Sequence, residues 1–232
     1  MKLEAKLEFR ITTALLIAGG EISSGLGIDK ATIRDKDGKL IIPASTIKGK
    51  LRDECQRILV GLNPNIFVCM PPRAEAMCPQ PFIDKKQNSV RCCPICEIFG
   101  SPWDPCPLYF SDLIVTSEDL NESRNIKIGV SIDRHSRTAK EKSLYYLETS
   151  PQGIEPAFIN SSKMSKGLTV HGEIKDAKHA ALLYVGIQSL LNIGGSKSVG
   201  LGWLDGDKIK KFSLDGEPFQ PSESELKEWK DG

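Results

Sequence analysis

The sequence predicts an α+β protein with a ferredoxin-like core, in which two helices cover one face of an antiparallel sheet. Apolar and polar side chains alternate strictly over residues 3–11, which is the period of a half-buried strand. Two later segments, 45–59 and 176–193, carry their apolar side chains at helical spacing. Extended segments precede and follow both helices, and this order of elements favours an α+β sandwich.

The N-terminal half is expected to hold a strand, a hairpin and the first helix. Residues 31–42 contain Asp37-Gly38, a pair typical of a tight hairpin turn. Ser45 is placed to cap the helix that follows. The apolar stripe of that helix consists of Ile47, Leu51, Cys55, Ile58 and Leu59. Gly49 within it costs roughly 1 kcal/mol relative to alanine, a cost that the close approach of another backbone would justify.

The C-terminal half is expected to combine strands with one further helix. Strands are predicted at 108–116, 126–132, 168–174 and 199–205. Residues 133–142 are polar and basic without an apolar stripe, which predicts a loop or an exposed hairpin. The helix over 176–193 has one apolar face, formed by Ala180, Leu183, Ile187, Leu190 and Leu191. A polar tail is expected from about residue 221.

Length and composition are those of a soluble protein with one large domain or two small ones, and we expect a single domain over 1–232. The 232 residues are 40% hydrophobic and 26% charged, and no stretch approaches the apolar length needed to span a bilayer. The charged, alternating N-terminus does not resemble a signal peptide, so we expect a cytoplasmic protein. The net charge of +1 means that any nucleic-acid binding must depend on local basic clusters. Within the domain we expect a cysteine-rich insertion at 62–107 and a polar extension at 206–232.

Cysteines are concentrated in the insertion in a way that predicts a metal site. Six of the seven lie between residues 69 and 106, and Cys93 and Cys96 have the two-residue spacing that chelates zinc readily. We expect Cys69, Cys78, Cys93 and Cys96 to bind a structural zinc ion, with Cys92 or Cys106 able to replace one of them. Four protein ligands would leave no open position for a substrate. Free buried thiols and disulfides are the alternatives.

A glycine-rich loop at 192–203 is the second candidate site. Its four glycines allow sharp turns and close approach of a ligand, and Lys197 adds a positive charge. Backbone N–H groups beside a lysine suit a phosphate chain, so Gly195, Lys197 and Gly200 are candidate phosphate contacts. The alternative is a tight connection between a helix and a strand, with glycine ending the helix.

Asp29 is the candidate for catalysis. It lies in a glycine-flanked segment beside Lys30, where a carboxylate could bind a divalent cation or accept a proton from a ribose hydroxyl. A solvated loop aspartate is the alternative. The sequence contains no serine nucleophile elbow, no His-Glu-x-x-His motif and no phosphate loop of the P-loop type.

Several segments, taken in order, resemble the repeat-associated mysterious protein (RAMP) superfamily, and in particular the backbone subunit of type III CRISPR effector complexes. The matching segments are 15–20, 27–29, 42–52, 93–100, 132–134 and 194–202. The resemblance implies an RRM-like palm that oligomerises along a CRISPR RNA. It also implies that residues 117–166 form a thumb-like insertion, whose basic part separates bases at regular intervals.

The resemblance further implies site residues. RNA contacts are expected from Ser45, Lys48, Lys50 and Arg52 in the first helix, from Arg134, His135 and Arg137 in the thumb, and from Gly195, Lys197 and Gly200 in the glycine loop. Asp29 falls where the family's target-cleaving aspartate lies. It would help a ribose 2′-hydroxyl attack the adjacent phosphate, as a base or as a ligand of Mg²⁺ or Mn²⁺.

The predicted function is therefore an RNA-guided endoribonuclease subunit, which binds CRISPR RNA and cleaves the paired target RNA. Its expected partners are both RNAs and other CRISPR effector subunits, assembled as a homo-oligomer or a hetero-oligomeric filament without a membrane. The alternatives are a structural RNA-binding subunit without cleavage, a CRISPR RNA processing endonuclease, and an unrelated zinc-bearing protein-interaction domain.

Overall fold

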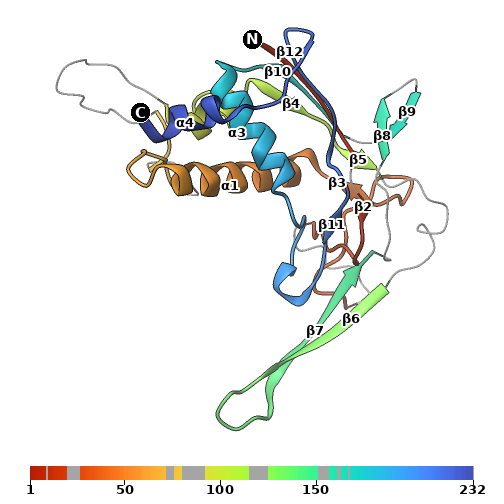
Figure 1. The fold of residues 1–232 in the computed structure, drawn as a ribbon. Coiled ribbons are helices and arrows are strands. Elements are labelled where there is room, and N and C mark those ends of the chain that lie inside the picture. The colour runs from red at the N-terminus through yellow and green to blue at the C-terminus, as the bar shows by residue number, and fades with distance from the viewer. Residues whose placement is uncertain are drawn as a thin grey trace.

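The computed structural model describes residues 1–8, 10–19, 27–71, 76–79, 92–114, 125–150, 157–160, 163–166 and 168–231, and it confirms the α+β class (Figure 1). The helices are α1 (Ala44–Leu62), α2 (Pro94–Phe99), α3 (Ala177–Gln188) and α4 (Glu223–Asp231), with a short 3-10 turn, η3 (Lys197–Val199). The strands are β1 (Lys2–Leu7), β2 (Arg10–Ile11), β3 (Ile41–Ile42), β4 (Leu108–Phe110), β5 (Leu113–Ile114), β6 (Asn125–Ile132), β7 (Ala139–Thr149), β8 (Ala157–Asn160), β9 (Lys163–Lys166), β10 (Leu168–Glu173), β11 (Leu204–Asp205), β12 (Ile209–Leu214) and β13 (Glu217–Pro218).

The main sheet has the strand order β13-β12-β1-β10-β4, and all its neighbouring strands are antiparallel. Its central strand, β1, buries Leu3, Ala5 and Leu7, so the predicted alternation is confirmed there. The predicted strand does not continue to its expected end, because the register between β1 and β12 shifts at the end of β1. Ile11 instead lies in β2, which pairs with β11 in a separate sheet, and Phe9 lies outside the described residues.

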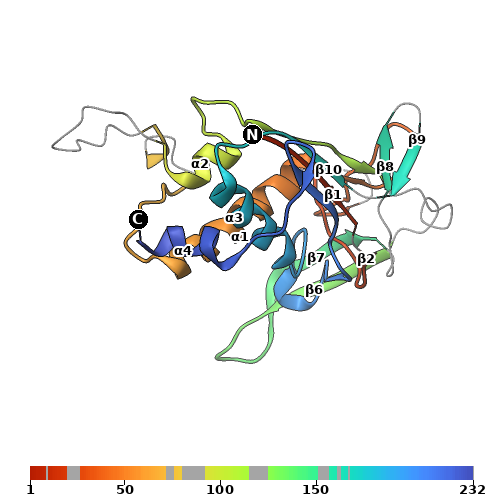
Figure 2. The same cartoon turned by 45° about the horizontal axis from the view of Figure 1, so that its top comes forward.

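Helices α1 and α3 pack against each other on one face of this sheet (Figures 1 and 2). The predicted apolar stripe of α1 is confirmed for Ile47, Leu51, Cys55 and Leu59, which are buried in the core that also takes up the inner side chains of β1. α3 begins where expected, because the Asp176 carboxylate accepts the N–H of His179 at 3.1 Å and caps the helix.

The expected cap of α1 is wrong. Ser45 lies inside the helix, which begins at Ala44 after Pro43. The backbone of Pro43 is extended, and no side chain of the cap residue bonds the first turn. The carboxylate of Asp112, far along the chain, accepts the N–H of Ala44 at 2.7 Å instead. A carboxylate distant in sequence therefore accepts an N–H group at the start of α1, in place of the serine hydroxyl that the local sequence predicted.

The close helix contact is at Gly186 rather than at Gly49. A Cβ at Gly49 would meet nothing within 4 Å, whereas a Cβ at Gly186 would overlap the Sγ atom of Cys55 in α1. Cys55 is fully buried, and its thiol donates weakly to the carbonyl of Leu182 in α3 at 3.7 Å. Burial and the nearby Glu54 carboxylate raise the pKa of this thiol, so it packs as a small apolar group.

Gly186→Ala should therefore destabilise the fold by about 1–3 kcal/mol through overpacking. Adding Cys55→Ala removes the overlapping sulfur and should restore stability to about the wild-type level. Urea unfolding of both single variants and the double variant measures the coupling between the two sites. Additive effects of the two substitutions would show that the contact between α1 and α3 does not limit residue 186.

Several predicted strands are shorter or divided. The predicted strand at 108–116 forms β4 and β5, which belong to different sheets. Of the predicted strand at 199–205, only Leu204 and Asp205 form a named strand, and Trp203 makes an isolated bridge to Asn192. Gly200 and Gly202 take positive φ angles, which turn the chain before it. The expected polar extension contributes β12, next to β1, and also α4, whose Trp229 is buried against the core.

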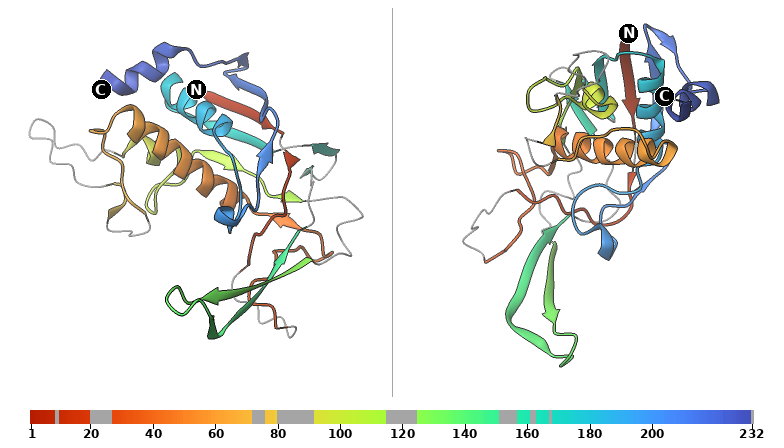
Figure 3. Two further views of the ribbon diagram at one scale, coloured as in Figure 1. Left: turned by 60° about the horizontal axis from the view of Figure 1, so that its bottom comes forward. Right: turned by 90° about the vertical axis from the view of Figure 1, so that its left-hand side faces the viewer.

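A long hairpin of β6 and β7 projects from the body of the molecule (Figures 1 and 3). The strand expected at 126–132 is confirmed as β6. Residues 133–138 form the turn at its tip, where Asp133 Oδ1 accepts the N–H groups of His135 and Ser136 at 2.8 and 2.9 Å. The basic segment is therefore an exposed hairpin tip, one of the two forms expected for it.

Candidate functional site

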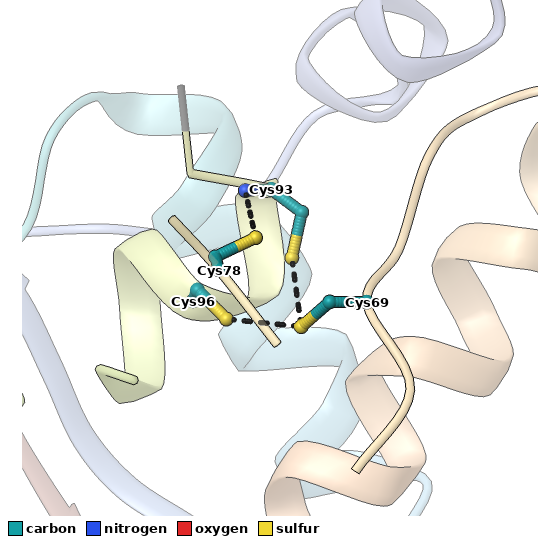
Figure 4. A group of neighbouring side chains, drawn as sticks. All are labelled: Cys69, Cys78, Cys93 and Cys96. Carbon is teal, nitrogen blue, oxygen red and sulfur yellow. Dashed lines mark hydrogen bonds between the residues drawn. The ribbon is translucent and has the colours of Figure 1, made fainter. Parts of the chain in front are cut away.

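Four buried cysteines converge between α1 and α2 (Figure 4). They are Cys69, Cys78, Cys93 and Cys96, and their Sγ atoms all lie within 4.8 Å of one another. The sulfurs of Cys69 and Cys96 are 3.2 Å apart, and those of Cys69 and Cys93 are 3.7 Å apart. Sulfur ligands placed tetrahedrally about 2.3 Å from a zinc ion lie about 3.8 Å from each other. The group thus fits a tetrahedral ion and could hold a metal such as zinc.

The start of α2 brings two of these cysteines together. Cys93 immediately precedes the helix, Pro94 occupies its first position, and Cys96 follows within the first turn. The N–H of Cys93 also donates to Cys78 Sγ at 3.2 Å. The two-residue spacing therefore places both sulfurs at the same end of a short helix.

The two cysteines that were open alternatives point elsewhere. Cys92 Sγ donates to the Asp104 carboxylate at 3.4 Å, and Cys106 Sγ donates to the carbonyl of Ile98 at 3.6 Å. Among the described residues, only the four expected cysteines form a group close enough to share an ion.

The pKa values of Cys93 and Cys78 are shifted in opposite directions. Hydrogen bonds from Cys96 and then from Cys69 lower the pKa of Cys93 to about 5, although burial opposes this. Burial raises the pKa of Cys78 to about 12. Since a metal binds thiolates, binding must displace protons from this group and should weaken as the pH falls.

The segment after Cys96 is tied to α3 by a charged cluster. Glu97 accepts from Lys175 Nζ at 2.6 Å and lies 2.9 Å from His179 Nε2, while His179 Nδ1 lies 2.5 Å from Asp176. His179 is buried and its ring meets Trp229 of α4 edge to face. The hydrogen bond from His179 is the main reason why the pKa of Glu97 falls from 4.5 to about 2.

Acid should weaken the fold through Glu97. Because its pKa is lower in the folded state, its contribution is complete above about pH 4.5 and is lost as the pH falls toward 2. Glu97→Gln should therefore lower stability at pH 7 and have little effect near pH 2. Urea unfolding of both proteins across this range measures the difference. A constant difference in the free energy of unfolding at every pH would contradict this role of the carboxylate.

A groove of about 450 Å³ lies where α1 meets the glycine loop. It is lined by Leu16, Ile17, Ala18, Lys30, Thr46, Gly49, Lys50, Asp53, Gly194, Gly195 and Ser196. Four segments far apart in sequence thus meet at one surface, and two of the lining residues are lysines. Of the expected RNA contacts, the groove contains Lys50 and Gly195.

Lys30, Thr46 and Ser196 line the groove but were not predicted from the sequence as site residues. The spacing in α1 could have identified Thr46, because Gly49, Lys50 and Asp53 follow it by three, four and seven positions and so share one helix face with it. A Cβ at Gly49 would meet nothing within 4 Å, so the space beside this residue is open. Lys50 Nζ lies 3.8 Å from Asp53 and 4.0 Å from Glu54, so its charge is partly balanced.

Backbone N–H groups of the glycine loop are bonded within the protein. The N–H of Gly195 donates to Leu16 at 2.8 Å, and that of Gly200 donates to Lys197 at 3.1 Å. These two amides are therefore used within the protein, unlike the free donors that the sequence suggested. At Gly202, φ is +69° and a Cβ would overlap the carbonyl oxygen of Ile193, so glycine is needed for the loop to close.

Asp29 is exposed and is bonded to the base of the projecting hairpin. Its Oδ2 atom accepts the N–H of Tyr146 in β7 at 2.7 Å, and its own N–H donates to the Tyr146 carbonyl at 3.0 Å. The next residue, Lys30, lines the groove and accepts from the N–H of Glu148. Asp29 thus lies at the junction of groove and hairpin.

A buried ion pair supports this junction. Glu148 is 2% exposed, and its Oε1 atom accepts from Arg34 Nη2 at 3.0 Å. Its Oε2 atom accepts the N–H of Thr32 at 3.3 Å. The pair fixes the segment after Asp29 against β7, and removing one partner would leave a buried charge.

The other expected RNA contacts lie apart from the groove. Ser45 and Lys48 lie in the first turns of α1 but do not line the groove. Lys197 is exposed in η3, next to the groove residue Ser196. Arg134, His135 and Arg137 are exposed at the hairpin tip, away from the helices (Figure 3).

Arg52 lies on the other side of α1 from the groove residues, against the thiol group. Its Nη2 atom donates to Cys96 Sγ at 3.0 Å, and its Nη1 atom donates to the carbonyl of Gly100 at 2.7 Å. The structure therefore does not bring Arg52 together with Lys50 and Lys197.

Comparison with known proteins gives the family of the chain. A search of curated proteins finds no match, and no helix in the described part of the chain is long and apolar enough to cross a membrane. The model of the RAMP superfamily matches residues 8–205, a span that includes the groove, the hairpin and the four cysteines. Since the match covers more than half of the sequence, the chain belongs to the RAMP superfamily.

Proposed function

We propose that the protein is a backbone subunit of a type III CRISPR effector complex, which binds CRISPR RNA in the groove and cleaves the paired target RNA. Its family indicates a CRISPR-associated role in RNA binding, and RAMP proteins generally work with RNA and other CRISPR subunits. The observation that carries the proposal is the convergence of Lys30, Lys50 and the glycine loop on one groove. A ribose-phosphate chain is polyanionic and is attracted to such a surface.

The proposed palm is ferredoxin-like. In the order β12-β1-β10-β4, α1 follows β1 and α3 follows β10, so each helix crosses over one face of the sheet between two of its strands. This arrangement supports the palm, with α1 and the glycine loop on the side where RNA would lie.

Within the groove, we assign phosphate binding to Lys50 and Lys30, and hydroxyl donation to Thr46 and Ser196. Gly195 would let the strand approach closely, and Lys48 and Lys197 would contact neighbouring phosphates. Arg52 is left out of this interface because its donors face the thiol group and the Gly100 carbonyl.

The hairpin is proposed to act as a wedge in the guide–target duplex. Ile128, Ile132 and Leu144 expose 66%, 63% and 54% of their surface on β6 and β7, although apolar side chains of this size usually find a partner. Apolar side chains inserted between base steps unstack and kink a duplex. The basic tip, with Arg134 and Arg137, would then hold the displaced backbone.

Asp29 is proposed as the catalytic residue for target cleavage. A ribose 2′-hydroxyl would attack the adjacent phosphorus and lose its proton to the Asp29 carboxylate, while the 5′-oxygen departs with a proton from water. The Tyr146 N–H fixes one carboxylate oxygen, which orients the other for the reaction. Mg²⁺ or Mn²⁺, the proposed cofactor, would supply charge neutralisation at the phosphate.

A structural subunit without cleavage is the second candidate. The observation that favours it is the same Tyr146 bond, since a carboxylate that anchors the hairpin has a structural reason to be there. The described groove does not favour the processing endonuclease. None of the three histidines lines the described groove, because His135 lies at the hairpin tip, His171 on the sheet and His179 in the core.

Lys50→Gln tests the groove. It should weaken binding of single-stranded RNA several-fold and reduce the slope of log K against log salt by about 0.7, as expected for one lost phosphate contact. Arg57→Gln, which removes an exposed charge of α1 outside the groove, is the matched control and should have little effect. Filter binding at several salt concentrations measures both. Equal losses in the two variants would show that general charge, and not the groove, binds RNA.

A further inference from the structure

The guanidinium of Arg52 lies against the sulfur group. Arg52 Nη2 is 3.0 Å from Cys96 Sγ and 3.8 Å from Cys69 Sγ. The Nη1 atom donates to the carbonyl of Gly100, the residue that ends α2. The arginine therefore contacts two sulfurs and the far end of the helix that carries one of them.

The third nitrogen of the Arg52 guanidinium, Nε, indicates the direction of the side chain. Its Nε atom is buried and has no hydrogen-bond partner among the described residues. Burial of an N–H group without a partner costs free energy, and an arginine that pointed into solvent would avoid this cost. The buried Nε therefore indicates that the side chain is directed into the protein. The side chain is held inward by its two terminal nitrogens, in a geometry that the planar guanidinium suits.

The charge of a metal-bound site explains what this contact would do. Four thiolates around one Zn²⁺ leave two negative charges in excess, and the four cysteines are buried, where an uncompensated charge is costly. The guanidinium would neutralise one of these charges. Its hydrogen bond to sulfur would also reduce the electron density that Cys96 donates to the metal.

We propose that Arg52 is a positioning residue of the metal site, which balances the thiolate charge and fixes Cys96 relative to α1. The role rests on the proposed zinc ion and is separate from RNA binding, where family resemblance placed this residue. It also gives the metal site a direct link to α1, the helix that forms one wall of the groove.

Two substitutions separate the parts of this role. Arg52→Met keeps much of the side-chain volume but removes the charge and all three hydrogen bonds. Arg52→Lys keeps the charge but loses the fork that reaches Cys96 and Gly100 together. Arg57→Gln is the control on the same helix, because Arg57 is exposed and pairs with Glu54 rather than with the sulfurs.

The test uses Co²⁺ and Zn²⁺ with the full chain. Arg52→Met should lower metal affinity about 10- to 100-fold, as loss of a partner of a metal ligand usually does, and Arg52→Lys should recover part of it. In the Co²⁺ protein, the sulfur-to-metal charge-transfer band should move to lower energy in Arg52→Met, because sulfur becomes a stronger donor. A general loss of stability would not produce that shift.

The outcomes distinguish the two levels of the proposal. Wild-type protein that binds neither metal would overturn the zinc site and this inference with it. Wild-type protein that binds metal, together with both variants at unchanged affinity and band energy, would overturn the role of Arg52 alone. If Arg52→Met does not fold, Arg52→Lys decides, since an unchanged affinity and band energy in that variant would exclude the bidentate role.

Discussion

Asp29→Asn should greatly slow cleavage of target RNA while the base of the hairpin stays protected, whereas Asp29→Ala should slow cleavage and also loosen the base of the hairpin at Tyr146. The asparagine side chain keeps an oxygen that can accept the Tyr146 N–H, now bonded at 2.7 Å, but it has no negative charge and is a very weak base. Alanine leaves that N–H without its acceptor. Loss of a positioned base typically costs 10²- to 10⁴-fold in rate, and we expect about that loss in Asp29→Asn.

Single-turnover cleavage of labelled target RNA, in assembled complexes with Mg²⁺ or Mn²⁺, measures the rate. Hydrogen exchange at Tyr146 reports on the base of the hairpin. Asp35→Asn is the matched control, because Asp35 also accepts backbone N–H groups, from Asp37 and Lys39, and lies in a turn outside the groove lining. Wild-type cleavage by Asp29→Asn would remove Asp29 from the chemistry and favour the structural subunit.

The cysteine site was predictable because its information is local. The spacing of Cys93 and Cys96 determines that both sulfurs lie at the start of a short helix, and the density of cysteines around them supplies the other two ligands. The alternation of β1 and the apolar stripe of α1 were predictable for the same reason, since a strand or helix face follows from residue spacing.

The interpretation of single basic residues was harder, because spacing gives a helix face but not what covers it. Lys50 and Arg52 are two residues apart in α1, yet Lys50 lines the groove and Arg52 meets the sulfurs. Which neighbour each face meets depends on the placement of the insertion, a tertiary fact. The cap of α1 has the same character, since Asp112 lies 68 residues away from Ala44.

β12 was missed because its sequence does not alternate. Ile209 is half-buried and Lys210 and Lys211 are exposed, while Phe212, Ser213 and Leu214 are all buried in succession. The last three are buried on both faces of the strand, where α3 contributes to one side and the Ser213 hydroxyl donates to the Glu4 carbonyl in β1. The alternation of apolar and polar residues cannot identify such a strand, because Ser213 is polar yet buried, with its hydroxyl bonded to the neighbouring backbone.

Removal of the metal should loosen one part of the chain and leave the rest folded. Cys96→Ser should lose the bound ion, since a hydroxyl is a poor replacement for a thiolate on zinc. Around it, α2 keeps core contacts of its own, because Ile95, Ile98 and Phe99 are fully or almost fully buried. The segments around Cys69 and Cys78 contribute few such side chains, so we expect them to depend most on the ion.

The effect should therefore be large locally and moderate globally. A zinc finger without its metal unfolds because the ion supplies most of its folding free energy, whereas here the four cysteines join a larger core, most of which the sheet, α1 and α3 form. We expect limited proteolysis to cut Cys96→Ser or chelator-treated protein within 64–79, while the body resists. Cys106→Ser, outside the four-sulfur group, is the control and should keep both metal and resistance. Cooperative unfolding of the whole chain on chelation would instead mean that the sulfur group supports the palm itself, and that α2 cannot hold its place through Ile95 and Phe99 alone.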